Sequence, residues 1–127
     1  MYYNKPMSKL LIVDDELDVR EFARHFFRKR GIDVSVASTG AEALLAVEAV
    51  CPDLILLDIR MEDMSGVDVL KELRRRNNVV KVVMVSGVED ERVIQETVAL
   101  GALGFIHKPL ILEELEKVVL REFSFQS

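Results

Sequence analysis

The chain has 127 residues, half of them hydrophobic, and a formal net charge of −5 at pH 7. This length is typical of one domain, and the hydrophobic content is enough for one core, which excludes a largely disordered chain. The charge does not favour non-specific binding of nucleic acid, and no apolar run approaches the ~20 residues that span a membrane. Cys51 is the only cysteine, so an internal disulfide is excluded and a reducing, cytoplasmic compartment fits. We expect Cys51 to be a small buried apolar residue.

The first predicted strand is the apolar run at residues 10–13, which is followed by two carboxylates, Asp14 and Asp15. A short continuous apolar run is typical of a strand that is covered on both faces. Residues 16–30 then carry apolar side chains at helical spacing, which predicts an amphipathic helix. A second strand is predicted over residues 32–37.

A second helix is predicted over residues 40–50, and a third strand over residues 53–57 ends directly before an aspartate. The following helix is predicted over residues 66–76. Ser65 is a suitable N-cap for it, because a serine side chain there accepts a hydrogen bond from the first turn of the helix. Asp68 stands three residues later, which is a weak form of the capping box.

A fourth strand is predicted over residues 79–85 and a fifth over residues 103–106. Ser86 follows the fourth strand, and Lys108 lies just beyond the fifth. The stretch between the two strands, residues 89–100, is predicted to be a helix. Three acids in its first turn suit the positive end of the helix dipole.

The last helix is predicted over residues 111–122. Five strands and five helices therefore alternate strictly along the chain. This alternation predicts an α/β fold with a doubly wound, five-stranded parallel sheet, right-handed crossovers and helices on both faces. We expect residues 1–8 to be a flexible N-terminal extension, residues 9–122 to be one domain, and residues 123–127 to be a frayed C-terminus or the start of a linker.

Ligands of an open parallel sheet bind outside the carboxyl ends of its strands. The residues that follow the predicted strands are carboxylates, a hydroxyl and an amine, namely Asp14, Asp15, Asp58, Ser86 and Lys108. Clustered carboxylates repel one another, and the pKa of one of them rises unless a cation intervenes. Mg²⁺ prefers oxygen ligands and commonly bridges carboxylates to phosphate, and a carboxylate can itself attack phosphorus to form an aspartyl phosphate. The pattern therefore indicates magnesium-dependent phosphoryl chemistry.

The motifs around these residues resemble the receiver domain of two-component response regulators over nearly the whole chain, from about Lys9 to Arg121. They are LIVDDE at 11–16, LILLDIRM at 54–61, MSG at 64–66, VSG at 85–87 and GFIHKP at 104–109. Each motif alone is weak, but all of them in order, each after a predicted strand, are highly specific. The resemblance implies a (βα)5, flavodoxin-like fold of the chemotaxis-regulator kind.

The resemblance also implies a role for each site residue. Asp58 matches the phosphoacceptor. Asp15 and Asp58 match direct Mg²⁺ ligands, with the backbone carbonyl of Arg60 as a third ligand and Mn²⁺ as a substitute ion. Asp14 would hold a metal-bound water or orient Lys108, whose amine would contact a phosphoryl oxygen.

Further implications concern the switch. The hydroxyl of Ser86 would move to the phosphoryl group, and Phe105 stands at the aromatic switch position. A cis peptide is expected between Lys108 and Pro109. One departure is that Glu62 replaces the usual proline of the loop after the phosphoacceptor, which puts the rigidity of that loop and the choice of partner in doubt.

The implied partners are a histidine kinase or phosphotransfer protein, which would donate the phosphoryl group, and an output domain or target protein. The face formed by the fourth helix, the fifth strand and the fifth helix would control that output, and a homodimer through this face is compatible. No direct nucleic-acid binding and no membrane association are expected. The domain would be a signalling phosphoacceptor rather than an enzyme, with self-catalysed phosphoryl transfer and dephosphorylation only.

Three alternatives stay open. Asp14 and Asp15 could simply cap the first helix. The chain could be a phosphohydrolase similar to the haloacid dehalogenase family, but that family needs an aspartate where Arg60 stands, and no cap insertion is present. It could also be an interaction module that has lost phosphorylation, against which the intact site set argues. In the receiver family, Arg60 and Val88 stand at positions that tune how fast the phosphoryl group is lost.

Overall fold

The computed structural model describes residues 8–87 and 89–123. Within them, one parallel sheet contains β1 (Lys9–Val13), β2 (Asp33–Ala37), β3 (Leu54–Asp58), β4 (Lys81–Ser86) and β5 (Gly104–His107). The strands alternate with α1 (Leu17–Arg28), α2 (Gly40–Val50), α3 (Gly66–Arg75), α4 (Glu91–Ala99) and α5 (Leu112–Phe123). The predicted doubly wound fold is therefore confirmed, and the ends of most elements differ from the predicted ones by one or two residues.

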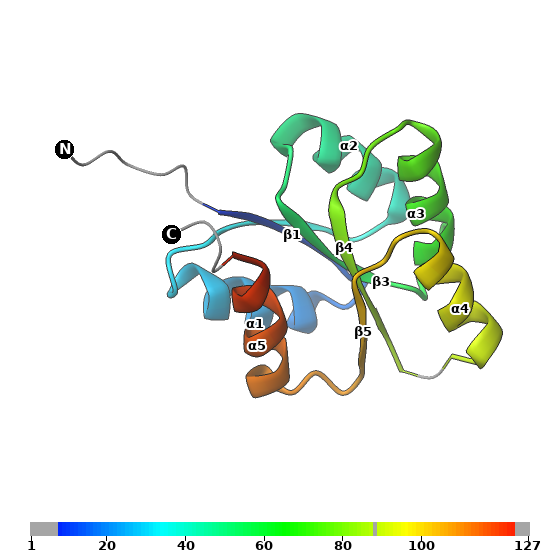
Figure 1. The fold of residues 1–127 in the computed structure, drawn as a ribbon. Coiled ribbons are helices and arrows are strands. Elements are labelled where there is room, and N and C mark those ends of the chain that lie inside the picture. The colour runs from blue at the N-terminus through cyan, green and yellow to red at the C-terminus, as the bar shows by residue number, and fades with distance from the viewer. Residues whose placement is uncertain (1–7, 88, 124–127) are drawn as a thin grey trace.

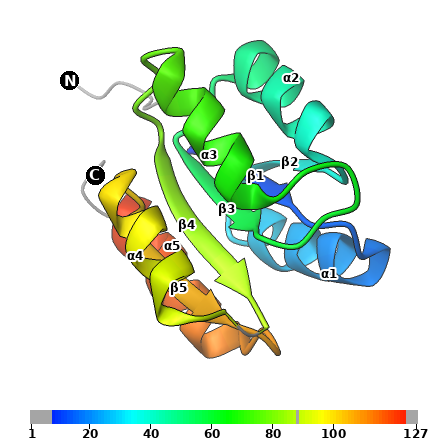
Figure 2. The same cartoon turned by 90° about the vertical axis from the view of Figure 1, so that its right-hand side faces the viewer.

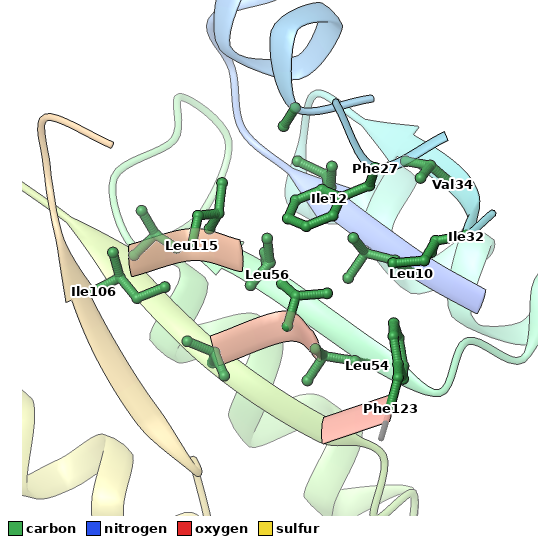
Figure 3. Close-up of a cluster of buried hydrophobic side chains, with 14 residues drawn as sticks. Leu10, Ile12, Phe27, Ile32, Val34, Leu54, Leu56, Ile106, Leu115 and Phe123 are labelled. Carbon is green, nitrogen blue, oxygen red and sulfur yellow. The ribbon is translucent and has the colours of Figure 1, made fainter. Parts of the chain in front are cut away.

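The sheet lies between two layers of helices. Helices α1 and α5 cover one face, and helices α2, α3 and α4 cover the other (Figure 1 and Figure 2). Successive side chains of a strand point to opposite faces, so Leu10 belongs to the cluster under α1 and α5 whereas Leu11 belongs to the opposite cluster. Figure 3 shows the first cluster, in which Phe27 of α1 and Leu115 of α5 pack with residues of the strands. Covering on both faces explains why the strands read as unbroken apolar runs.

The strand order is β2-β1-β3-β4-β5, so the direction of winding reverses between β1 and β3. In open parallel sheets, the carboxyl ends of the strands at such a reversal border a crevice that binds ligands. The register aligns Val13 of β1 with Leu57 of β3, which brings the residues after these two positions to the same edge of the sheet. The fold thus selects one edge as the place for a site.

Two helix starts show how local sequence sets the boundaries. Ser65 and Asp68 form the predicted capping box at the start of α3, each side chain accepting the backbone N–H of the other. Helix α4 begins at Glu91, two residues later than predicted, because the side chain of Asp90 accepts from Val93 N and makes Asp90 the N-cap. Glu89 consequently lies outside the helix.

The expectation that Cys51 is buried is wrong. Cys51 is exposed because it ends α2 in the left-handed conformation, with φ 53°, and its N–H donates to the Val47 carbonyl. At the other end of the chain, Phe123 completes α5 and its ring is buried in the first cluster, so this residue is part of the packed helix rather than a frayed end. The rest of that predicted end, residues 124–127, lies outside the described residues, as do residues 1–7 and Val88.

No helix within residues 8–87 and 89–123 has the length and apolar character needed to cross a membrane.

Candidate functional site

Two acids are buried at the carboxyl edge of the sheet. Asp14 follows β1 and Asp58 ends β3, and each is 3% exposed. The backbone of Asp14 is fixed by its N–H, which donates to the Ala37 carbonyl at 3.1 Å. Asp58 is aligned with Val85 of β4, so its position follows from the sheet register. The hydrophobic strands therefore hold two carboxylates out of water side by side.

Lys108 connects these acids. Its backbone N–H donates to the Ser86 carbonyl at 2.8 Å, which fixes the chain just after β5. Its Nζ lies 3.0 Å from Oδ2 of Asp14, 3.3 Å from Oδ2 of Asp58 and 3.2 Å from Oε1 of Glu16. The predicted cis peptide between Lys108 and Pro109 is confirmed. One amine thus contacts carboxylates that are far apart in the sequence.

The charges of this cluster are incompletely balanced. Burial and, second, the negative charge of Asp14 raise the pKa of Asp58 from its ordinary 3.8 to about 6, although Lys108 and the backbone N–H of Arg60 act in the opposite direction. Burial alone would lower the pKa of Lys108, but the hydrogen bond and charge of Asp14 and the charge of Asp58 outweigh it and raise that pKa well above its usual range. Lys108 is therefore a permanent cation beside an acid that ionises reluctantly.

The residues predicted to hold a metal ion come together in two overlapping groups. Carboxylate oxygens of Asp14, Asp15 and Glu16 all lie within 4.8 Å of one another, while Asp58 reaches Asp14 through the amine of Lys108. Four carboxylates and a single amine leave an excess of negative charge. All the side-chain ligands available are hard oxygens, which is the donor set that Mg²⁺ prefers.

The alternative that Asp14 and Asp15 cap the first helix is wrong. The N-cap of α1 is Glu16, and that cap has no side-chain hydrogen bond. Oδ1 of Asp14 instead accepts from the N–H of Glu16 at 2.9 Å, a local turn that orients the carboxylate towards the sheet edge. Both acids are thus available to the cluster.

Ser86 makes a contact that sequence reasoning missed. Its hydroxyl, in a residue only 1% exposed, donates to Oε2 of Glu89 at 2.8 Å. Nε of Arg60 donates to the same oxygen, also at 2.8 Å. The side chain of Glu89 is 5% exposed, whereas that of Arg60 is 74% exposed. The sequence pattern predicts Glu89 in the first turn of a helix, and the signal that excludes this is the better N-cap, Asp90, that follows it.

Backbone packing shapes the loop after Asp58. The N–H of Gly66 donates to the Ile59 carbonyl at 2.7 Å, and a Cβ on Gly66 would lie 2.2 Å from the carbonyl oxygen of Asp58. Only glycine fits at this point, which explains the glycine of the third motif. The backbone of the loop at Gly66 therefore packs directly against the backbone of Asp58, with no room for a side chain between them.

Asp63 ties the same loop to α2. Its two carboxylate oxygens accept from the N–H groups of Gly40 and Ala41 at 2.9 and 3.0 Å. These two hydrogen bonds lower the pKa of Asp63. Asp63 is adjacent to Glu62, which replaces the proline that is usual in this loop of the receiver family, so the loop is restrained by the Asp63 side chain instead of by a proline ring.

Phe105 lies on β5, away from the carboxylate cluster. Its ring is partly buried against the cluster under α2, α3 and α4, and its centroid is 5.0 Å from that of His107. The remaining predicted residues, Asp14, Asp15, Asp58, Ser86 and Lys108, lie at the carboxyl edge, as expected.

Comparisons with known proteins agree with this geometry. The family described as the response regulator receiver domain matches residues 10–120. The sporulation initiation phosphotransferase F of Bacillus subtilis is 32% identical over 94% of this chain and 97% of its own. The chemotaxis protein CheY of Listeria monocytogenes is 34% identical over 87% of this chain and 98% of its own. The regulatory protein AtoC of Escherichia coli is 33% identical, but the chain spans only 26% of that protein.

Solved structures give the same result. A receiver domain protein of Methanospirillum hungatei superimposes with a TM-score of 0.89 at 26% identity, covering 95% of this chain and 97% of that one. The response regulator protein TrrA of Thermotoga maritima, in complex with Mg(2+)-BeF, superimposes with a TM-score of 0.80 at 28% identity, covering 91% and 99%. The chain belongs to the response regulator receiver domains, the phosphoacceptor domains of two-component signalling.

Proposed function

We propose that Asp58 is the residue that accepts the phosphoryl group. A carboxylate oxygen of Asp58 attacks the phosphorus of a phosphohistidine in a partner, an O–P bond forms, the P–N bond breaks, and its electron pair returns to the imidazole, which takes up a proton. The observation that carries this proposal is the position of Asp58, buried at the point where the sheet reverses, with the amine of Lys108 at 3.3 Å. That amine is placed to stabilise charge on a phosphoryl oxygen.

The site fits Mg²⁺. We propose that the carboxylates of Asp15 and Asp58 and the backbone carbonyl of Arg60 would hold the ion, with Asp14 acting through a bound water or on Lys108. When bound, the ion would offset the clustered negative charge and polarise the transferring phosphoryl group. The donor chemistry supports this assignment, because the cluster of Asp14, Asp15 and Glu16 offers oxygen ligands only. The same donors would accept Mn²⁺.

We further propose that Ser86 and Phe105 connect the phosphoryl group to the output. The hydroxyl of Ser86 lies at the end of β4, two strand positions from Met84, which pairs with Phe105 in β5. A hydroxyl drawn towards the phosphoryl group would move the end of β4 and the start of α4, and with them the α4-β5-α5 face. That face would then bind a target, or a second copy of the chain.

The partners we propose are of two kinds: a histidine kinase or phosphotransfer protein as donor, and an output domain or target protein as receiver, in the cytoplasm. A larger output protein is supported by relatives such as AtoC, of which the chain spans 26%. The domain itself would catalyse only the gain and loss of its own phosphoryl group.

The test is incubation with Mg²⁺ and acetyl phosphate, followed by intact-mass measurement and heteronuclear NMR. The wild-type domain should gain one phosphoryl group that base and hydroxylamine both remove, as expected of an acyl phosphate, and the amide signals of the α4-β5-α5 face should shift. Asp58→Asn should show neither change. Modification of Asp58→Asn to the wild-type extent would refute Asp58 as the acceptor, and steady turnover of a small phosphate ester would favour the hydrolase alternative instead.

A further inference from the structure

The side chain of Glu89 receives two donors at a single oxygen. Oε2 accepts from the Ser86 hydroxyl and from Nε of Arg60, each at 2.8 Å. The carboxylate is 5% exposed, so these hydrogen bonds are what compensates its removal from water. Hydrogen bonds to a charged acceptor are about twice as strong as those between neutral groups. The contact therefore restrains Ser86 and Arg60 in the arrangement that the structure shows.

Both donors belong to residues at the phosphoacceptor. The backbone N–H of Arg60 lies 3.4 Å from Oδ1 of Asp58, and Ser86 ends the strand next to the one that Asp58 ends. A phosphoryl group on Asp58 would carry more than one negative charge and would accept hydrogen bonds strongly. It would compete with the Glu89 carboxylate for the Ser86 hydroxyl, and the two anions would repel each other.

We propose that Glu89 is a positioning residue that holds the side chains of Ser86 and Arg60 away from the phosphoacceptor in the unphosphorylated domain, and that phosphorylation has to displace it. This inference rests on the proposed function of Asp58. Glu89 lies between the end of β4 and the N-cap of α4, so its release would also free the start of α4. The contact thus sets the balance between the two states of the switch.

The experiment measures the affinity for beryllofluoride, a phosphoryl analogue, at saturating Mg²⁺. Calorimetry suits this chain, which has no tryptophan. Glu89→Gln should bind beryllofluoride about tenfold more tightly than wild type, because a charge-assisted hydrogen bond that stabilises only the unphosphorylated state is weakened. Glu89→Asp, which keeps the charge but shortens the side chain, should also bind more tightly.

Two controls separate the contact from a general effect of charge. Glu91→Gln removes an exposed carboxylate from the first turn of α4, and its affinity should stay within about twofold of wild type. In a Ser86→Ala background, most of the gain from Glu89→Gln should disappear, because the Ser86 hydroxyl, the restrained group for which the phosphoryl analogue competes, is gone. Circular dichroism and urea unfolding check that each variant folds, and Glu89→Asp carries the test if Glu89→Gln does not fold.

An unchanged affinity in both Glu89 variants would overturn the proposal, as would an equal gain in Glu91→Gln or a gain that persists in full without the Ser86 hydroxyl. A wild-type domain that binds no beryllofluoride would instead show that the proposed function has failed. The contact itself is checked without any ligand. The side-chain carboxyl ¹³C signal of Glu89 should shift in Ser86→Ala, and an unchanged signal would exclude the hydrogen bond on which the inference depends.

Discussion

The charge on Asp58 should destabilise the metal-free domain at neutral pH. Asp58 is 3% exposed, and burial followed by the charge of Asp14 raises its pKa from 3.8 to about 6. Asp58→Asn keeps the shape of the side chain and removes the charge. Lys108 keeps two of its three carboxylate contacts in this variant, those with Asp14 and Glu16 at 3.0 and 3.2 Å. We therefore predict that Asp58→Asn increases the free energy of unfolding.

The magnitude follows from the pKa. A carboxyl group that ionises at pH 3.8 in the unfolded chain and at about pH 6 in the folded domain disfavours folding once it is charged. A rise of roughly two in pKa, at ~1.4 kcal/mol each, corresponds to about 3 kcal/mol at pH 7. Below pH 3.8 the group is protonated in both states and contributes nothing. The free energy of unfolding of the wild-type domain should thus fall by about 3 kcal/mol as the pH rises from about 4 to about 6. Above about pH 6 this loss should stay constant.

Urea unfolding in the presence of a chelator, at several pH values between 4 and 7.5, measures this difference. The gain of Asp58→Asn over wild type should be about 3 kcal/mol at pH 7 and should shrink towards zero near pH 4. Asp33→Asn removes an exposed carboxylate of β2 and should change the free energy of unfolding by less than ~0.5 kcal/mol. If Asp58→Asn is no more stable than wild type at pH 7, or if its gain in unfolding free energy does not depend on pH, the Asp58 charge does not destabilise the fold.

Three further predictions concern the surroundings of the site. Gly66→Ala should lower the free energy of unfolding by about 1–3 kcal/mol, because its Cβ would meet the Asp58 carbonyl oxygen at 2.2 Å. Gly104→Ala, with nothing within 4 Å of the added Cβ, should not lower it, and equal losses in urea unfolding would contradict the packing argument. Asp63→Ala should speed hydrogen exchange at the amide of Gly40, which loses its carboxylate acceptor, and unchanged exchange by NMR would show that the anchor does not restrain the loop. Mg²⁺ at about a hundredfold excess over its Kd should stabilise the wild-type domain by about 2.7 kcal/mol, which is measured as a rise in Tm that a chelator reverses. An equal rise in Tm in Asp58→Asn would argue against Asp58 as a ligand.

The part of the site that the sequence predicts is the part fixed by backbone topology. The carboxyl ends of parallel strands lie at the same edge of the sheet. A residue that follows an apolar run can therefore be assigned to that edge once the run is recognised as a strand. This reasoning predicts Asp14, Asp58 and Lys108 at one edge, and in the structure the amine of Lys108 contacts both carboxylates. The strictly alternating pattern predicted the sheet and its two helical layers for the same reason.

The side-chain contacts that cross between elements could not be predicted in this way. The sequence predicts Glu89 in the first turn of a helix, where acids are common, whereas in the structure its carboxylate accepts the Ser86 hydroxyl. Asp63 lies 23 residues from Gly40 in the sequence, and no periodicity relates a loop acid to the start of a distant helix. The prediction that Cys51 is buried is wrong for a local reason, because the left-handed end of α2 turns its side chain towards solvent. Patterns of hydrophobicity carry no information on such contacts.

The packing of the sheet and the chemistry of its edge have the same origin. The apolar run of β3, Leu54 to Leu57, is buried on both faces, and Asp58 is the next residue of the same strand. The core that fixes the position of this carboxylate also removes it from water, which is the largest cause of its raised pKa. Lys108 opposes that effect without cancelling it. A change that restores the charge balance at this edge, whether the binding of a dication or the removal of the Asp58 charge by substitution, must therefore also stabilise the fold, so stability measurements report directly on the charge state of the site.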